Sequence, residues 1–205
     1  MSASERPLIA VLDYGIGNLR SAQKALERVG ADARLTADHG LIAEAAGVVL
    51  PGVGAFGRCM EELRSSRLDG TVHECVASGR PFLGVCVGMQ LLYEESEEKK
   101  GERGLGVLPG CVRLLPATVK RPQMQWNRLH VVRSSRLFDG LGDDAWVYFV
   151  HSYAPDDPVN VVATCDYGGP IVAVVERDNV AATQFHPEKS GANGLRLLQN
   201  FVASC

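Results

Sequence analysis

Long hydrophobic runs are missing from this sequence of 205 residues. The longest apolar stretches, such as Leu8–Leu12, are far shorter than the ~20 residues that a helix needs to cross a bilayer. Residues 1–7 also lack the apolar core and the small-residue cleavage site of a secretory signal. We therefore expect a cytoplasmic protein that does not cross a membrane.

An excess of charge of one sign is also missing. The chain has 21 Lys and Arg against 24 Asp and Glu, a net charge of -3, and no basic run interleaved with aromatic residues. A protein that binds nucleic acid by neutralising phosphates would carry a basic patch or stripe. Nucleic-acid binding is therefore not expected.

Signatures of metal and cofactor sites are absent as well. The six cysteines are scattered singly without a C-x-x-C pair, which argues against a zinc site and against a disulfide framework. Segment 13–20 starts like a G-x-G-x-x-G dinucleotide loop but has Arg20 in place of the third glycine, and no P-loop for ATP is present. We expect no metal and no cofactor.

The first half of the chain alternates strand-like and helix-like segments, which is typical of β-α units on a parallel sheet. Strands are expected at 8–12, 48–50 and 81–85, with helices at 19–29, 59–63, 71–77 and from 89 onward. Short β-type runs dominate after residue 105, before a final helix over 194–202. A chain of this length buries about 70% of its surface, enough for one core. The sequence predicts an α/β fold with an open, mostly parallel sheet flanked by helices and a β-rich second half.

The sharpest local feature is the segment GVCVG at residues 84–88, between a predicted strand and a predicted helix. It matches the nucleophile elbow G-x-S-x-G with Cys86 in place of serine, because two glycines permit a strained turn that exposes the central residue. At a helix N-terminus the pKa of this thiol would be lowered, and Val87 N–H could donate to an oxyanion. The alternative is a buried structural cysteine in a glycine-rich turn.

A cysteine nucleophile needs a base and a group that orients the base. The predicted strand 180–185 ends at His186, and Pro187 biases that histidine to extended geometry, so that Glu188 points to the same side. Cysteine, histidine and carboxylate would then meet at the strand ends of one sheet edge, where α/β folds bind ligands. Taken separately, a surface histidine and a solvated acid remain possible interpretations.

A second glycine loop, LPGVGAF at residues 50–56, follows another central strand. Its backbone N–H groups could complete an oxyanion hole. The alternative is an ordinary turn between a strand and a helix.

Two of these motifs together resemble a known family. GVCVGMQ at residues 84–90, followed by FHPE at 185–188, is similar to the class I (triad) glutamine amidotransferases. More narrowly, the glutaminase subunits of imidazole glycerol phosphate synthase, from histidine biosynthesis, are similar in segments that span nearly the whole chain in the same order. These segments are 13–18, 50–56, 104–110, 148–153 and 186–190. The resemblance implies that residues 1–205 form a single amidotransferase domain.

The resemblance implies hydrolysis of glutamine to glutamate and ammonia through a thioester on Cys86. His186 would act as the base and later as the acid, and Glu188 would orient it. The implied oxyanion groups are Gly52, Val53 and Val87. The implied glutamine-binding positions are Gln90, Glu98, His151, Ser152 and Tyr153, although a solvated charge is an alternative for Glu98.

The resemblance also implies a partner, a (β/α)₈-barrel cyclase that uses the ammonia to make imidazole glycerol phosphate and AICAR, in a heterodimer. We expect this partner because the chain length leaves no room for an acceptor domain. The implied interface positions are Asn18, Met124, Trp126 and Lys189. Val87 occupies a position at which leucine is commoner in the family. Because its implied role is that of a backbone N–H donor, the change of side chain does not affect it. Gln125 stands where glycine is usual; if that glycine has a positive φ, Gln125 would strain or reshape its loop.

Two other functions stay open on the sequence. One is the glutaminase of another pathway, such as anthranilate, pyridoxal phosphate or guanylate synthesis. The other is a catalytically silent binding subunit of the same fold, against which the presence of Cys86, His186 and Glu188 argues.

Overall fold

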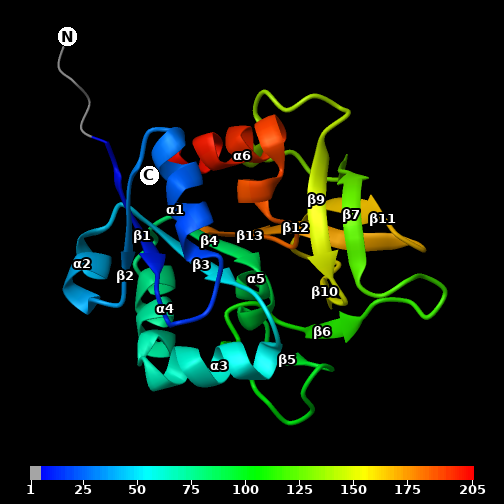
Figure 1. The fold of residues 1–205 in the computed structure, drawn as a ribbon, viewed down its shortest axis with the longest axis horizontal. Helices are drawn as coiled ribbons and strands as arrows, with labels where there is room; N and C mark the ends of the chain where they lie inside the picture. Colours follow the sequence, from blue (N-terminus) through cyan, green and yellow to red (C-terminus); the bar gives the residue numbers. More distant parts are fainter. Residues whose placement is uncertain (1–5) are drawn as a thin grey trace.

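The computed structural model describes residues 6–205, so the prediction about a secretory signal lies largely outside the described residues. An eight-stranded sheet with the strand order β2-β1-β3-β4-β13-β12-β11-β8 forms the centre of the fold (Figure 1). Its parallel part comprises β1 (Leu8–Leu12), β2 (Asp32–Thr36), β3 (Gly47–Gly52), β4 (Phe82–Cys86) and β13 (Val180–Thr183). Its antiparallel part adds β12 (Pro170–Arg177), β11 (Val161–Asp166) and β8 (His130–Val131).

Helices cover both faces of the sheet. The helices α1 (Leu19–Arg28) and α6 (Gly191–Ala203) pack against each other, and α3 (Phe56–Ser65) packs against α4 (Leu68–Ala77) and the short α5 (Val87–Leu91). Figure 1 shows the two groups on opposite sides of the sheet, with α2 (His39–Glu44) near its edge. Every residue of β3, β4 and β13 is buried, as expected for central strands that are covered on both faces.

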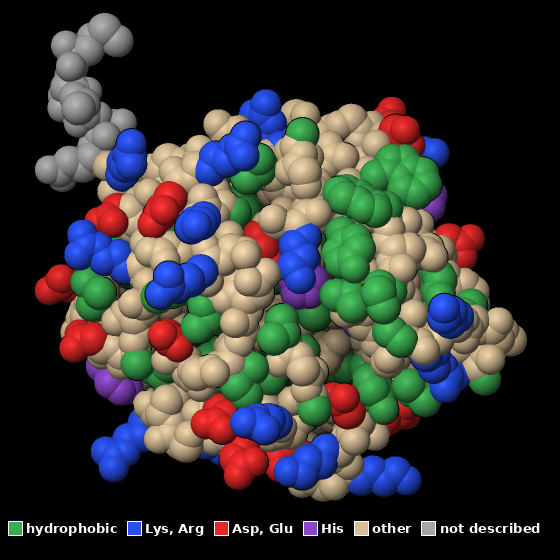
Figure 2. All heavy atoms as spheres, viewed as in Figure 1, with side chains coloured by type: hydrophobic (Ala, Val, Ile, Leu, Met, Phe, Trp, Pro, Cys, Tyr) green, Lys and Arg blue, Asp and Glu red, His purple; other side chains and the backbone are tan. Residues whose placement is uncertain are grey.

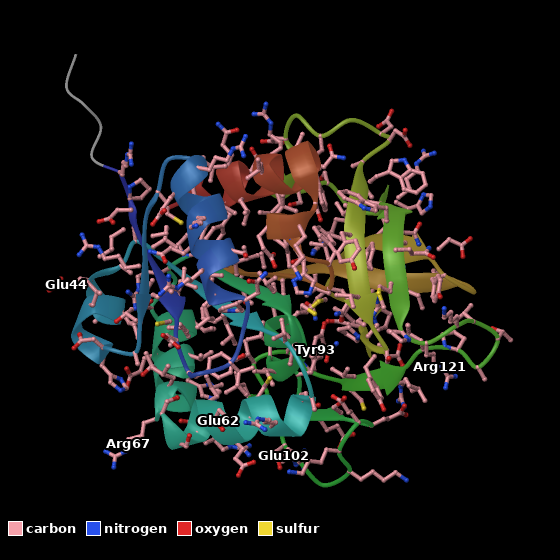
Figure 3. All side chains as sticks on the ribbon, in the orientation of Figure 1. Glu44, Glu62, Arg67, Tyr93, Glu102 and Arg121 are labelled. Carbon is pink, nitrogen blue, oxygen red and sulfur yellow. The ribbon has the colours of Figure 1, made fainter. Side chains whose placement is uncertain are left out.

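Two small sheets extend the second half of the chain. One contains β5 (Glu95–Ser96), β6 (Cys111–Leu114) and β10 (Tyr153–Asp156), and the other pairs β7 (Gln123–Arg128) with β9 (Trp146–His151). Short 3-10 helices lie at Arg136–Phe138 and Pro187–Lys189. The buried Tyr93, labelled in Figure 3, donates its hydroxyl to Asp157 at 2.9 Å and so ties the end of the parallel half to the β-rich half.

Several expectations from the sequence need correction. Residues 122–127 were expected to form a loop, which Gln125 would strain or reshape if the glycine usual at that position has a positive φ. They lie mainly in strand β7, and Gln125 is absent from the described residues with positive φ. The polar sequence of β7 carries no alternating hydrophobic pattern, because only Gln123 is buried in it. Strand β2 and helix α2 were also missed by the sequence analysis. Both are short and partly exposed, so neither has a clear hydrophobic pattern. Asn18 precedes α1 as expected but makes no side-chain capping bond.

None of the helices formed by residues 6–205 has the length and apolar character needed to span a membrane.

Candidate active site

Cys86 ends strand β4 and directly precedes helix α5. Its backbone has φ 55° and ψ -113°, a conformation that L-residues rarely adopt and that functional turns can store as strain. A Cβ on Gly88 would overlap the carbonyl oxygen of Leu50, and one on Gly84 would lie 3.1 Å from Gly88 O. Gly88 is therefore required for the close packing of the turn, and Gly84 leaves room that a larger residue would crowd, in agreement with the elbow motif.

The Cys86 side chain is less exposed than the sequence suggested. The residue is 3% exposed and lines a cleft of about 630 Å³ instead of pointing freely into solvent. Burial at the wall of a cleft is compatible with nucleophilic chemistry, because a substrate held there reacts away from bulk water.

His186 reaches the same edge of the sheet from β13. Strand β13 runs parallel to β4 with Thr183 opposite Val85, so the chain beyond β13 emerges beside Cys86. His186 Nδ1 lies 2.8 Å from Glu188 Oε1, and both side chains are at most 4% exposed. Glu188 reaches the imidazole through the 3-10 turn Pro187–Lys189, whereas the sequence suggested an extended chain at this point.

The environment of His186 favours its protonated form. Burial alone would lower its pKa, but hydrogen bonds to Cys86 and Glu188 and the charges of these two groups outweigh it, raising the pKa of His186 to about 9. The second oxygen of Glu188, Oε2, is buried without a hydrogen-bond partner in residues 6–205. Of the two Glu188 oxygens, only Oε1 therefore holds the imidazole.

The cleft gathers most of the residues singled out from the sequence. Its walls consist of Gly17, Asn18, Val53, Gly54, Cys86, Val87, Gln90, Glu98, Pro122, Val150, His151, Ser152, Tyr153, His186 and Lys189. All predicted glutamine-binding positions are among them. Gly52 and Glu188 line a small adjoining cavity, and the side chains of Met124 and Trp126 do not reach the cleft.

Comparison with known proteins places this chain in a family. Residues 10–205 match the family "Glutamine amidotransferase class-I". The chain belongs to the class-I glutamine amidotransferases. The fold class and the family resemblance derived from the sequence are thereby confirmed, and the elbow, histidine and carboxylate described above lie within the matched range.

Relatives of this amidotransferase are similar over nearly the whole chain. A protein from Salinibacter ruber named imidazole glycerol phosphate synthase subunit HisH is 50% identical, with 96% of this chain and 94% of the relative aligned. A protein of the same name from Aquifex aeolicus is 48% identical, with 93% of this chain and 94% of the relative aligned. The PurLQS structure from Thermotoga maritima has a TM-score of 0.76 at 21% identity over 97% of this chain and 98% of that chain, which supports the fold.

The turn that carries the histidine of this amidotransferase is fixed by Ser190. Its hydroxyl donates to His186 O at 2.6 Å and accepts a hydrogen bond from Tyr148 N at 3.0 Å, and Ser190 is buried. His186 N in turn donates to Tyr148 O. Strand β9 and the 3-10 turn are thereby joined next to the imidazole.

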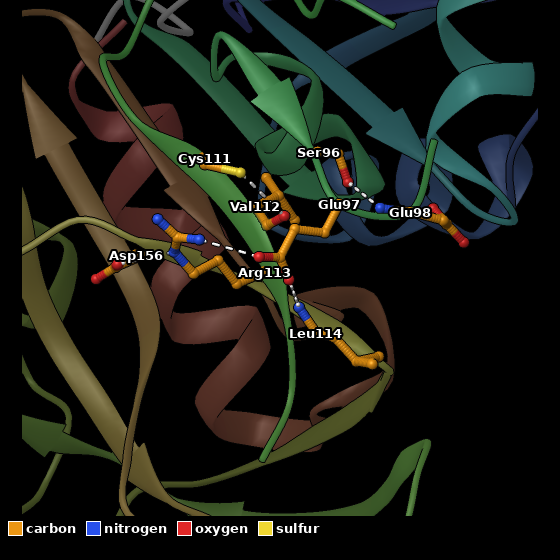
Figure 4. Close-up of polar contacts among 8 residues, drawn as sticks. All are labelled: Ser96, Glu97, Glu98, Cys111, Val112, Arg113, Leu114 and Asp156. Atoms are coloured by element: carbon orange, nitrogen blue, oxygen red, sulfur yellow. Dashed lines mark hydrogen bonds and ion pairs between the residues drawn. The ribbon is translucent and has the colours of Figure 1, made fainter. Parts of the chain in front are cut away.

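Glu98 is anchored in the cleft and is not a freely solvated charge. Its Oε2 accepts a hydrogen bond from Phe56 N at the start of α3, at 2.7 Å. Its own amide donates to Ser96 Oγ, and the adjacent Glu97 binds Arg113 and Leu114 N (Figure 4). These contacts hold the Glu98 carboxylate beside residues 51–54, which contain the predicted oxyanion groups Gly52 and Val53 and are called the oxyanion segment.

Gln90 and His151 face inward. Gln90 Nε2 donates to Tyr153 O at 3.0 Å and to Gln184 Oε1 at 3.1 Å. The ring nitrogens of His151 lie 2.8 Å from Tyr153 O and 3.0 Å from Gln123 Oε1, and burial lowers its pKa to about 4. Both side chains therefore help to shape the wall of the cleft.

Three side chains near the nucleophile were not identified from the sequence. Gln184 Nε2 lies 3.8 Å from Cys86 Sγ, and Tyr14 and Cys59 contact the oxyanion segment. The position of Gln184 one residue after β13 offered a weak signal, because chain leaving that strand approaches Cys86. Nothing in the local sequence indicated the other two contacts.

The positions expected to face a partner form an apolar surface beside the cleft. Met124 and Trp126 on β7 are 62% and 47% exposed, and the Trp126 ring packs edge-on against Tyr148 of β9. Figure 2 shows hydrophobic side chains gathered over the region of β7 and β9. Lys189 and Asn18 lie at the cleft itself, so this surface and the cleft are continuous.

Proposed function

We propose that this protein is the glutaminase subunit of an imidazole glycerol phosphate synthase, which hydrolyses glutamine and passes ammonia to a cyclase subunit. The observation that carries the proposal is the buried His186–Glu188 pair beside a strained Cys86 elbow. The HisH names of relatives about 50% identical support this pathway over anthranilate, pyridoxal phosphate or guanylate synthesis. The presence of Cys86, His186 and Glu188 together argues against a catalytically silent binding subunit.

The first half of the reaction forms a thioester. The Cys86 thiolate attacks the side-chain carbonyl carbon of glutamine, and the developing oxyanion accepts a hydrogen bond from Val87 N–H. The protonated His186 gives its proton to the leaving nitrogen, and ammonia departs. The high pKa of His186 suits this step, because the ring still carries its proton at neutral pH.

The second half regenerates the enzyme. Neutral His186 takes a proton from water, hydroxide adds to the thioester carbon, and the carbon–sulfur bond breaks to release the γ-carboxylic acid, which gives its proton to solvent water to become glutamate. The Cys86 sulfur leaves as a thiolate and the proton remains on His186, restoring the starting pair. Glu188 keeps the imidazole in one orientation through both halves.

The backbone orientation of the oxyanion segment supports the proposal that the glutaminase must be activated before it hydrolyses glutamine. Val48 N donates to Pro81 O, so the backbone N–H and C=O of Val48 point toward β4. In a parallel ladder every second residue of a strand directs its backbone groups to the same neighbouring strand, so those of Gly52 also point toward β4. The Gly52 carbonyl is then directed toward the start of α5, and Val53 N–H is directed to the opposite side. We infer that the peptide between Gly52 and Val53 must turn before Val53 N–H can serve as the second oxyanion donor.

The remaining cleft residues suit a free amino acid. The Glu98 carboxylate can pair with the α-ammonium of glutamine, and backbone groups of His151, Ser152 and Tyr153 can bind its carboxylate and ammonium ends. Gln90 supports that backbone through its bond to Tyr153 O. This arrangement selects a substrate with both charges of an α-amino acid.

The partner would be a (β/α)₈-barrel cyclase that docks on the apolar surface of Met124 and Trp126 in the cytoplasm. Asn18 and Lys189 would contact it at the cleft, where ammonia is released. Docking next to the oxyanion segment gives the partner a direct way to turn the Gly52–Val53 peptide. Glutamine hydrolysis should therefore be slow in the isolated subunit and fast in the complex.

The test uses the complex with its cyclase and the nucleotide substrate of that cyclase. Cys86→Ala should abolish synthesis from glutamine while leaving synthesis from ammonium chloride unchanged. The isolated chain should hydrolyse glutamine at least about tenfold more slowly than the complex. Loss of both synthetic activities in Cys86→Ala, or equally fast hydrolysis without the partner, would overturn the proposal.

A further inference from the structure

Two buried side chains outside the Cys86, His186 and Glu188 group bind the oxyanion segment from behind. They are Tyr14, which follows β1, and Cys59, in the first turns of α3. Tyr14 is 3% exposed and Cys59 is fully buried. Neither residue can reach glutamine in the cleft, since neither lines it.

Tyr14 binds the segment at its start. Its hydroxyl donates to Pro51 O at 2.7 Å, and a Cβ on Gly52 would lie 2.9 Å from the same hydroxyl oxygen. Burial, the strongest influence, raises the pKa of Tyr14, and the neighbouring Cys59 and Cys86 raise it further. The hydroxyl therefore stays protonated and acts as a donor at neutral pH.

Cys59 binds the segment one peptide further along. Its Sγ lies 3.3 Å from Val53 O, within the range of a weak thiol hydrogen bond. Burial raises the pKa of this thiol to about 11, with further contributions from Glu98 and Cys86 against the lowering effect of Tyr14. Cys59 is thus a protonated donor and is not a second nucleophile.

The two contacts lie on either side of one peptide group. Pro51 O belongs to the peptide before Gly52, and Val53 O belongs to the peptide after Val53. The group between them contains Val53 N–H, the second oxyanion donor in the proposed function. Holding both neighbours restricts rotation to ψ of Gly52 and φ of Val53, so the peptide can turn while its Cα atoms stay in place.

We propose that Tyr14 and Cys59 are positioning residues that hold the peptides flanking Gly52–Val53, so that activation turns this one peptide into a defined position. The inference rests on the proposed glutaminase function. Without either contact the activated segment samples several positions, and Val53 N–H meets the oxyanion less often. The loss falls on kcat because the donor acts only in the transition state.

The experiment compares Tyr14→Phe, Cys59→Ala and Cys59→Ser in the complex with the cyclase. Tyr14→Phe should lower kcat for glutamine about tenfold and Cys59→Ala about threefold, with KM within about twofold of the parent. Cys59→Ser keeps a donor and should recover most of the loss. Synthesis from ammonium chloride and alkylation of Cys86 by iodoacetamide should not change, because neither uses the oxyanion hole.

Matched controls separate positioning from general destabilisation. Tyr167 also donates its hydroxyl to a backbone carbonyl, Lys120 O at 2.8 Å, and Cys75 is a buried cysteine on α4. Tyr167→Phe and Cys75→Ala should leave kcat for glutamine within about twofold of the parent.

Unchanged kcat in Tyr14→Phe, or failure of Cys59→Ser to recover the loss, would overturn the inference. A parallel loss of iodoacetamide alkylation would overturn it too, since the whole site would then be disturbed. If Cys86→Ala still used glutamine, the proposed function would fail instead.

Discussion

The α-carbon of Gly88 packs directly against the carbonyl oxygen of Leu50, so closely that a methyl group on Gly88 would overlap this oxygen. Gly88 belongs to the turn that carries Cys86, the proposed nucleophile, and Leu50 belongs to the strand that leads into the proposed oxyanion segment. The two parts of the site are therefore joined by backbone contact. A small displacement of β3 is transmitted to the elbow, and the reverse also holds.

Gly88→Ala should disrupt both parts. The added methyl group can be accommodated only by moving β3 or α5, and we expect the free energy of unfolding to fall by about 3 kcal/mol, with glutamine hydrolysis reduced at least about tenfold. Urea denaturation and turnover in the complex measure these effects. Gly70→Ala is the control, because Gly70 is an exposed position of α4 with open space around it. Equal stability of the two variants would contradict the packing described here.

Glu188→Gln should shift the pH dependence of glutamine turnover. The hydrogen bond and charge of Glu188 help to raise the pKa of His186 to about 9, so their loss lowers this pKa. Turnover of the parent should fall as the pH rises through about 9, where the ring loses the proton that the leaving ammonia needs. In the variant this fall should occur at lower pH, with kcat reduced about 10²-fold. An alkaline limb at the same pH in both proteins would contradict this role.

Ser190→Ala should loosen the histidine turn. It leaves Tyr148 N without its buried partner and His186 O with Lys189 N as its remaining donor, at a cost of about 1–3 kcal/mol. Thermal unfolding of the isolated chain and kcat of the complex should both decrease. Ser204→Ala provides the comparison, because Ser204 is exposed and its hydroxyl donates only to Phe201 O at the end of α6. A Ser190→Ala variant as stable as Ser204→Ala would show that the turn does not depend on this hydroxyl.

Trp126→Ala should weaken partner binding without affecting the fold. An exposed aromatic anchor at the centre of an interface contributes about 2 kcal/mol, equivalent to about a 30-fold increase in Kd. Titration calorimetry with the cyclase measures the change, and the unfolding midpoint should fall only slightly, because Trp126 is 47% exposed and its ring packs edge-on against Tyr148. Val159→Ala, at a position that is 77% exposed outside β7 and β9, should bind as the parent does. Unaltered binding by Trp126→Ala would place the partner elsewhere.

Acidification should destabilise the fold through His151. Burial lowers its pKa to about 4, below the unfolded value of about 6.5, so between these values the unfolded state binds more protons. Stability should therefore fall by up to about 3 kcal/mol as the pH drops through this window. His186 does not contribute there, because its raised pKa leaves it protonated in both states until the pH exceeds the unfolded value. The decrease should be smaller in His151→Asn, and an equal decrease would assign it to other groups.

The sequence by itself determined the elements whose signals are local. Glycines at 84 and 88 around Cys86 specify a sharp turn, and buried apolar runs specify β1, β3, β4 and β13. Parallel order in an α/β fold then places Cys86 and His186 at the same edge of the sheet. This reasoning predicted the main chemical groups, because turn geometry and strand alternation depend on neighbours along the chain, whereas the family came from the resemblance of the motifs at 84–90 and 185–188.

Only the tertiary structure decided the contacts between distant segments. Tyr14 and Pro51 are 37 residues apart, and Gln184 and Cys86 are 98 apart, so no local pattern joins them. Strand β7 likewise had no periodic signal, because its side chains are mostly polar or exposed, so its pairing with β9 could not be foreseen. Burial of Cys86 and the turn that brings Glu188 to His186 also follow from packing. Local sequence fixes which backbone turns form, whereas the positions of these side chains depend on how complete layers pack together.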